Sequence, residues 1–116
     1  MRINARKHED VVIFDIEGEF RISEVSDVTL HQLVKDQLDL GNLNILLNLE
    51  KTGSIDSTCV GEILSSYISI TNKGGSLLRA NTSDKVELIF QVTGLKRIIP
   101  NHESIEKALA SINHPN

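Results

Sequence analysis

The sequence predicts an α/β fold, with a mixed and mostly parallel β-sheet and about four α-helices. Its 116 residues suit a single domain, because one hydrophobic core usually closes at about 100–200 residues. Hydrophobic residues make up 40% of the chain but aromatic residues only 3%, and such an aliphatic composition is typical of strands covered on both faces by helices. Aliphatic runs alternate with segments of helical periodicity, which favours parallel strands joined by right-handed crossovers.

The predicted order of elements is β-β-α-β-α-β-α-β-α. Short β-branched or aliphatic runs bounded by turn residues predict strands at 2–7, 11–16, 45–49, 76–81 and 97–99, the first of them at an edge. Apolar residues spaced three and four apart predict helices at 23–40, 57–73, 86–93 and 105–112, and glycines at 41, 74–75 and 94 end the first three. With no repeat or linker, the prediction is one domain over 1–116, with a frayed tail at 113–116.

The helix at 57–73 has the strongest periodicity in the chain. It follows a segment at 50–56 that we expect to be a polar loop. Apolar side chains recur at helical spacing and predict the buried stripe of this helix: Val60, Ile63, Leu64, Tyr67, Ile68 and Thr71. The opposite positions are expected to be exposed and available to a partner: Thr58, Glu62, Ser65, Ser66 and Ser69.

Composition excludes several classes of function. The formal charge of −4 and the isoelectric point near 5.5 disfavour nucleic-acid binding, which requires a basic surface. The single cysteine, Cys59, excludes an intramolecular disulfide and a cysteine-rich zinc site. The N-terminal residues lack the apolar region of a signal peptide, and no run reaches the ~18 apolar residues that a membrane span needs. We therefore expect a cytoplasmic protein without membrane insertion.

The sequence also predicts neither an enzyme nor a bound metal or cofactor. The four histidines lack metal-ligand spacing, and His31 is expected to be a solvated helix residue. Phosphate-binding and nucleophile-elbow glycine motifs are absent. The carboxylates Glu17, Glu19, Glu103 and Glu106 are isolated along the chain and are expected to lie on solvated faces.

Residues 54–61, at the start of the 57–73 helix, carry two interpretations. Asp, Ser and Thr are favoured N-cap residues, because their side-chain oxygens accept hydrogen bonds from the first turn, so helix capping alone explains them. The functional alternative uses the same physics. A phosphate on a serine at a helix N-terminus meets N–H donors and the positive end of the dipole, and it changes the surface that a partner contacts.

Several motifs occur in the order found in one known family. They are Gly18-Glu19, the strand Ile45-Leu46-Leu47-Asn48-Leu49-Glu50, Ile55-Asp56-Ser57-Thr58 with Gly61, Gly74-Gly75, Thr93-Gly94-Leu95, and Ser104 with Ala108-Leu109. This ordered set resembles STAS domains, specifically the bacterial anti-sigma factor antagonists, over nearly the whole chain. The resemblance implies the STAS fold.

The resemblance also implies a partner-switching regulator of transcription. Its partners would be a serine kinase that doubles as an anti-sigma factor and has a histidine-kinase-like ATPase fold, and a PP2C-type phosphatase. By motif position Ser57 would be the phosphoacceptor, with Thr58 as a minor alternative site and Asp56 beside it. The partner-binding residues would be Asp56, Ser57, Thr58, Cys59, Glu62, Ser65, Ser66, Ser69 and Arg21. The alternative is a STAS scaffold, not phosphorylated, within a sensor or transporter complex.

Two residues depart from the family pattern. Cys59 stands where the family has glycine, and it is interpreted either as a small buried residue or as a thiol activated by the helix N-terminus. Arg21 stands where the family has aspartate, and it is either a solvated turn residue or a partner for Asp56 or for a phosphate on Ser57.

Overall fold

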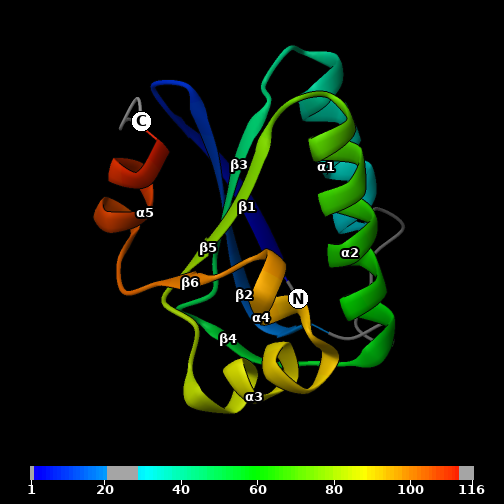
Figure 1. Ribbon diagram of the computed structural model, residues 1–116, viewed down its shortest axis with the longest axis vertical. Helices are drawn as coiled ribbons and strands as arrows, with labels where there is room; N and C mark the ends of the chain where they lie inside the picture. The colour runs from blue at the N-terminus through cyan, green and yellow to red at the C-terminus, as the bar shows by residue number, and fades with distance from the viewer. Residues whose placement is uncertain (1, 21–28, 113–116) are drawn as a thin grey trace.

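The computed structural model describes residues 2–20 and 29–112, which form a six-stranded sheet with helices on both faces (Figure 1). The strands are β1 (Arg2–His8), β2 (Val11–Phe20), β3 (Asn44–Asn48), β4 (Thr52–Ile55), β5 (Ser76–Ala80) and β6 (Asn101–His102). The helices are α1 (Leu30–Asp39), α2 (Ser57–Asn72), α3 (Asp84–Thr93), α4 (Leu95–Ile98) and α5 (Ile105–Ile112). Strand order is β1-β2-β3-β5-β6, with β4 paired to β2, and only β1 is antiparallel to its neighbour.

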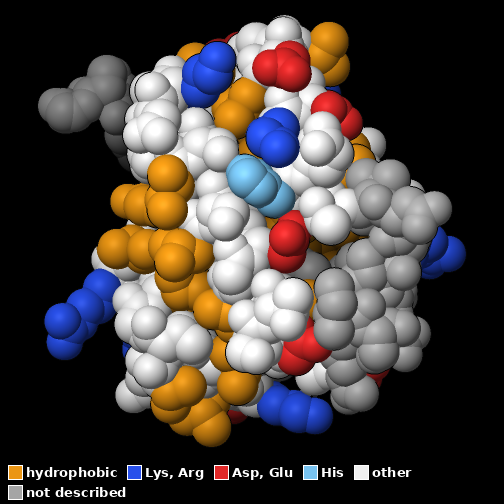
Figure 2. Space-filling view, turned by 90° about the vertical axis from the view of Figure 1, so that its right-hand side faces the viewer, with side chains coloured by type: hydrophobic (Ala, Val, Ile, Leu, Met, Phe, Trp, Pro, Cys, Tyr) orange, Lys and Arg blue, Asp and Glu red, His pale blue; other side chains and the backbone are white. Residues whose placement is uncertain are grey.

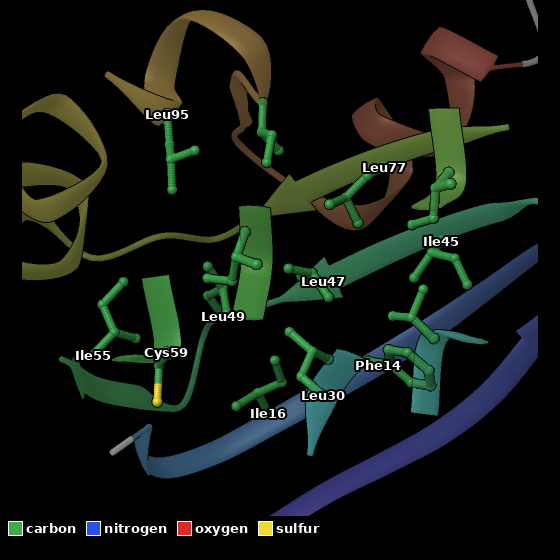
Figure 3. Close-up of a cluster of buried hydrophobic side chains, with 14 of the residues drawn as sticks. Phe14, Ile16, Leu30, Ile45, Leu47, Leu49, Ile55, Cys59, Leu77 and Leu95 are labelled. Atoms are coloured by element: carbon green, nitrogen blue, oxygen red, sulfur yellow. The ribbon is translucent and has the colours of Figure 1, made fainter. Parts of the chain in front are cut away.

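Alternation along the central strands produces two separate cores, because successive side chains of a strand point to opposite faces of the sheet. Val12, Phe14 and Ile16 of β2 belong to the larger core beneath α1 and α2, shown in Figure 3. Val11 and Ile13 point to the opposite face, where the smaller core is closed by Ala108 of α5. The prediction of strands buried on both faces is therefore confirmed.

The predicted helix ends agree closely with the structure. The backbone is left-handed at Gly41, Gly74 and Gly94, which follow α1, α2 and α3. Gly75 is required for another reason, since a Cβ atom there would lie 1.9 Å from the carbonyl oxygen of Leu43. Part of the predicted first helix, 23–28, lies outside the described residues, and its described portion begins at Leu30 with Thr29 as N-cap.

Three strand predictions are wrong. The segment 50–56 is not simply a polar loop, because β4 forms within it and pairs with the end of β2. That pairing extends β2 to Phe20, beyond the predicted end at residue 16, with a register shift between Gly18 and Glu19. The predicted strand at 97–99 overlaps α4 instead, and the two-residue β6 follows it.

The buried face of α2 also differs from the prediction. The fully buried residues of this helix are Cys59, Ile63, Ser66 and Ile70. Their mean direction is rotated by about 100° from the predicted stripe, at about 100° per residue. Leu64 and Ile68, which were predicted to be buried, are 40% and 49% exposed. Ser66 tolerates burial because its hydroxyl donates to the carbonyl oxygen of Glu62, at 2.8 Å.

Candidate functional site

The candidate site lies at the N-terminus of α2, where Asp56 caps the helix. Asp56 has extended backbone angles, and its Oδ1 accepts a hydrogen bond from the backbone N–H of Cys59 at 2.9 Å. Ser57 is therefore the first residue inside the helix, and its side chain is exposed, as is that of Thr58. The residue that caps the helix and the predicted phosphoacceptor are thus two different residues.

Strand β4 holds this helix start in a fixed position. It pairs with β2 at Gly18↔Thr52 and Phe20↔Ile55. The buried Thr52 hydroxyl donates to the carbonyl oxygen of Ile16 at 2.7 Å, and the Ser54 hydroxyl donates to the Glu19 carboxylate. Glu19 is only partly exposed and takes part in this contact, so the expectation of an isolated solvated carboxylate is wrong for it. The chain enters α2 directly from a strand of the sheet.

Cys59 faces the core and not the surface. Its side chain is 1% exposed, and Figure 3 shows the sulfur among buried side chains near Ile55. Burial, together with the nearby Asp56 carboxylate, raises the pKa of the Cys59 thiol to about 12. A thiol with that pKa is almost entirely protonated near neutral pH, so the structure favours the buried-residue interpretation over the activated thiol. A side chain that points inward also leaves the helix surface open to a partner.

The polar residues of α2 that were predicted to contact a partner lie on a different side of the helix from Ser57. Glu62 Oε1 accepts from the backbone N–H of His31 at 3.0 Å, and the Ser69 hydroxyl lies 2.9 Å from His31 Nε2. These contacts join α1 to α2. Ser66 is 0% exposed, so its predicted exposure is wrong, and Ser65 is partly exposed. His31 is partly buried and hydrogen-bonded, which corrects the expectation of a solvated side chain.

Arg21, the last predicted partner-binding residue, lies outside the described residues. The described part of the chain contains no cluster of three or more His, Cys, Asp or Glu side chains that could hold a metal ion. Its helices include none with the length and apolar character to cross a membrane.

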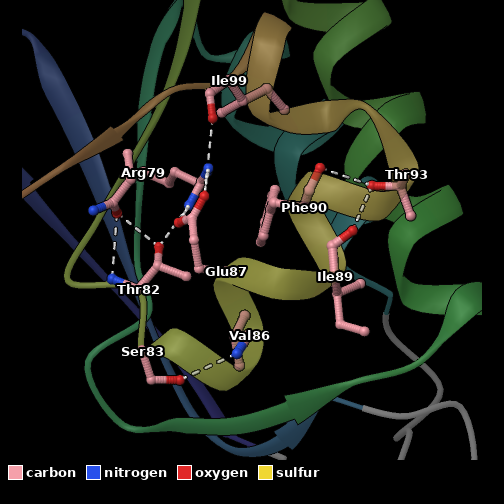
Figure 4. A network of polar contacts seen from close by, with 10 residues as sticks. Arg79, Thr82, Ser83, Val86, Glu87, Ile89, Phe90, Thr93 and Ile99 are labelled. Atoms are coloured by element: carbon pink, nitrogen blue, oxygen red, sulfur yellow. Dashed lines mark hydrogen bonds and ion pairs between the residues drawn. The ribbon is translucent and has the colours of Figure 1, made fainter.

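The sequence analysis missed a buried ionic network around Arg79 of β5. The guanidinium is 0% exposed and makes two hydrogen bonds to the Glu87 carboxylate, at 2.7 and 3.1 Å (Figure 4). Its Nε donates to the carbonyl oxygen of Ile99, and its Cζ lies 3.9 Å from the centroid of the Phe90 ring. The hydrogen bonds to Arg79 outweigh partial burial and lower the pKa of Glu87.

This network joins β5, α3 and the residue after α4, and α3 in turn packs against β4, which leads into the candidate site. The sequence did contain a signal for this buried ion pair. An arginine inside an aliphatic strand that is covered on both faces needs a buried partner, since an unpaired buried charge is very costly. The sequence did not indicate which carboxylate supplies that partner.

Comparisons with known proteins agree with this architecture. The STAS domain model matches residues 2–108. The chain therefore belongs to the STAS domain family, and its mixed sheet with helices on both faces is the STAS fold.

The named proteins that this chain resembles indicate which kind of STAS domain protein it is. The chain is 31% identical over 104 residues to a protein of Thermotoga neapolitana named as an anti-sigma factor antagonist, with 90% of this chain and 91% of the relative covered. It is 26% identical over 112 residues to the anti-sigma F factor antagonist of Paenibacillus polymyxa, covering 97% and 95%. The protein is thus an anti-sigma factor antagonist-like STAS protein.

Two solved structures show the same fold. The crystal structure of a Thermotoga maritima protein named as a putative anti-sigma factor antagonist superposes with a TM-score of 0.83 at 28% identity, covering 97% of this chain and 95% of the other. The Bacillus protein SpoIIAA in its phosphorylated form gives a TM-score of 0.74 at 19% identity, covering 97% and 100%. The second likeness concerns the fold alone.

Proposed function

We propose that this protein is a cytoplasmic partner-switching regulator whose state is set by reversible phosphorylation of Ser57. In the unphosphorylated state it binds a serine kinase that acts as an anti-sigma factor, and this binding releases the sigma factor or another client. A PP2C-type phosphatase restores the unphosphorylated state. The similarity to anti-sigma factor antagonists supports the choice of partner.

The observation that carries the proposal is the separation of capping from exposure at the start of α2. Asp56 supplies the cap, so the exposed Ser57 hydroxyl can be modified without removing that hydrogen bond. A phosphate on the first residue of a helix lies near free N–H donors and the positive end of the helix dipole. The helix therefore tolerates the modification while its surface changes.

The chemistry is a phosphoryl transfer. Ser57 Oγ forms a bond to the γ-phosphorus of ATP, the bond from that phosphorus to the bridging oxygen breaks, and ADP leaves. The hydroxyl proton passes to a base of the kinase. In the reverse branch, the phosphatase uses water to release inorganic phosphate and regenerates the serine hydroxyl.

The switch operates through charge. Phosphorylation adds a charge of about −1.5 to −2 at a position that is otherwise uncharged. The Asp56 and Glu62 carboxylates are already near this end of the helix, and α2 itself contains no Lys or Arg. No cation of α2 therefore neutralises the new charge. A partner that contacts the unphosphorylated surface then meets electrostatic repulsion and a desolvation cost.

Phosphorylation is tested with the serine-kinase anti-sigma factor of the source organism and ATP, by intact-mass spectrometry. The expected result is a gain of one phosphate by the wild-type protein and by Thr58→Ala, and no gain by Ser57→Ala. Because Asp56 provides the cap, Ser57→Ala should keep the wild-type Tm and so serves as a folded control. Modification of Ser57→Ala but not of Thr58→Ala would move the phosphoacceptor to Thr58.

Kinase binding by the Ser57→Asp variant distinguishes the phosphorylation switch from the alternative, a STAS scaffold that is not phosphorylated. An aspartate in the first turn is compatible with the helix dipole, so the variant should fold normally. The switch predicts loss of kinase binding, whereas a scaffold that is never phosphorylated predicts nearly unchanged binding. Unchanged binding together with no mass gain would refute the proposed function.

A further inference from the structure

Strand β4 carries one residue more than β2 at the point where the two strands pair. The register matches Gly18 with Thr52 and Glu19 with Ser54, so a single step along β2 corresponds to two steps along β4, and Gly53 is the extra residue. Such a β-bulge redirects nearby side chains and is common beside functional sites. Figure 1 shows β4 between β2 and α3, running toward the first turn of α2. The irregular part of the sheet therefore lies just before the candidate site.

The side chain of Glu19 occupies the space over this bulge. Its carboxylate accepts a hydrogen bond from the Ser54 hydroxyl. A Cβ atom at Gly53 would lie 2.9 Å from Glu19 Oε1, so the carboxylate fits over β4 because residue 53 has no side chain. The bulge, the glycine and the serine hydroxyl thus all accommodate one carboxylate group.

Two other sets of contacts hold α2, and both lie away from the exposed Ser57 side chain. The core holds the inner side of the helix start, because Ile55 is 7% exposed and Cys59 is 1% exposed. The contacts that join α1 to α2 at His31 begin more than one turn beyond Ser57. Figure 2 faces the layer of α1 and α2 and shows a histidine side chain near its middle. The outer side of the helix start therefore depends on the chain that enters it.

The Glu19–Ser54 contact lies on that entering chain. Both residues are partly exposed, so the contact is at the outer side of β4. Ser54 precedes Ser57 by three residues, which is at most about 11 Å of extended chain. A change in the path of β4 at Ser54 therefore moves the Ser57 hydroxyl. A displacement of about 1 Å of a reacting group can lower a reaction rate about 100-fold.

We infer that Glu19 is a positioning residue for the phosphorylation of Ser57. By holding Ser54 across the bulge, its carboxylate fixes the direction in which β4 enters α2 and so the place of Ser57 Oγ in the kinase. The inference rests on the proposed function, in which Ser57 is the phosphoacceptor. Glu19 acts through Ser54 and the intervening backbone, and the phosphoryl transfer itself involves Ser57 and the kinase.

The test measures kcat and KM for phosphorylation of each variant, with catalytic amounts of the kinase and saturating ATP, by intact-mass spectrometry. Glu19→Ala and Ser54→Ala should each lower kcat at least tenfold and change KM less than threefold, because the lost interaction places the hydroxyl for reaction. The matched control is Glu17→Ala. Glu17 lies two residues earlier on the same strand and bonds to Arg2, so this variant should react at the wild-type rate.

Two further variants separate positioning from a general loss of stability. Glu19→Gln keeps an oxygen that can accept from the Ser54 hydroxyl, so it should restore most of the rate. Gly53→Ala places its methyl group against the flexible end of Glu19 and not against backbone, so the fold should accommodate it while the carboxylate moves away. This variant should lower kcat as Glu19→Ala does, with little change in Tm. A merely structural contact would lower the Tm and leave kcat unchanged.

The outcomes distinguish this inference from the proposed function. Wild-type kcat values for Glu19→Ala, Ser54→Ala and Gly53→Ala would overturn the inference and leave the phosphorylation of Ser57 standing. A lower kcat that Glu19→Gln does not restore would also overturn it, since the charge and not the Ser54 contact would then be required. Should Glu19→Ala fail to fold, Gly53→Ala decides between these results. If the wild-type protein gains no phosphate on Ser57, the proposed function fails and the inference falls with it.

Discussion

Glu87→Gln tests whether the buried Arg79–Glu87 pair holds α3 and α4 against the sheet. The substitution keeps the size of the side chain but removes its charge, and its amide group can replace only one of the two acceptors that Arg79 uses, at 2.7 and 3.1 Å. The guanidinium stays fully buried with its charge uncompensated. Removing one partner of a fully buried ion pair costs about 3–5 kcal/mol, and the cost should fall at or below the bottom of that range here because the Glu87 side chain is 23% exposed. We therefore expect a loss of about 2–3 kcal/mol.

Urea denaturation at neutral pH measures this loss. With a slope of about 1.5 kcal/mol per molar urea, the midpoint should fall by about 1.3–2 M. The matched control is Glu103→Gln, which removes the same charge from the exposed ion pair with Lys107 and should change stability by less than about 0.5 kcal/mol. Equal midpoints for the two variants would refute the structural role of the buried pair.

The pH dependence gives a second measurement of the same pair. Since the pKa of Glu87 is lowered in the folded protein, its stabilising contribution is complete above the pKa of the unfolded chain. It is lost as the pH falls through the folded pKa. The stability difference between wild type and Glu87→Gln should therefore shrink progressively under acidic conditions. A difference that stays constant down to strongly acidic pH would contradict the lowered pKa.

Three further predictions concern the surroundings of the site. Asp56→Ala should destabilise the protein by about 1 kcal/mol, measured by thermal unfolding, because it removes the cap on α2, and a Tm equal to that of wild type would refute the capping role. Cys59 should react slowly with iodoacetamide in the native protein at pH 8 and rapidly in denaturant, since burial raises the pKa of its thiol to about 12, and equal rates would contradict its burial. Gly75→Ala should lower the Tm strongly, because its Cβ would overlap the Leu43 carbonyl oxygen at 1.9 Å, and an unchanged Tm would disprove this close approach.

The site was predicted from the sequence only in part. Asp56, Ser57 and Thr58 occur at the predicted helix start, because capping preferences depend on neighbouring residues alone. The exposure of the polar side of α2 was predicted only in part, since Ser66 is buried and Ser65 and Ser69 are partly exposed. These residues are polar in sequence, but their exposure depends on neighbouring elements. The hydroxyl of Ser66 is satisfied within its own helix, which lets it face the core.

Local patterns in the sequence by themselves determined the α/β class, the central strands and the ends of the first three helices. Aliphatic runs and glycines encode these features over a few residues, so no distant contact is needed to recognise them. Tertiary structure alone decided that β4 pairs with β2, that Arg79 is buried against Glu87, and which side of α2 faces outward. Each of these depends on residues far apart in the chain, since a hydrogen-bond partner or a covering surface is absent until the sheet has formed.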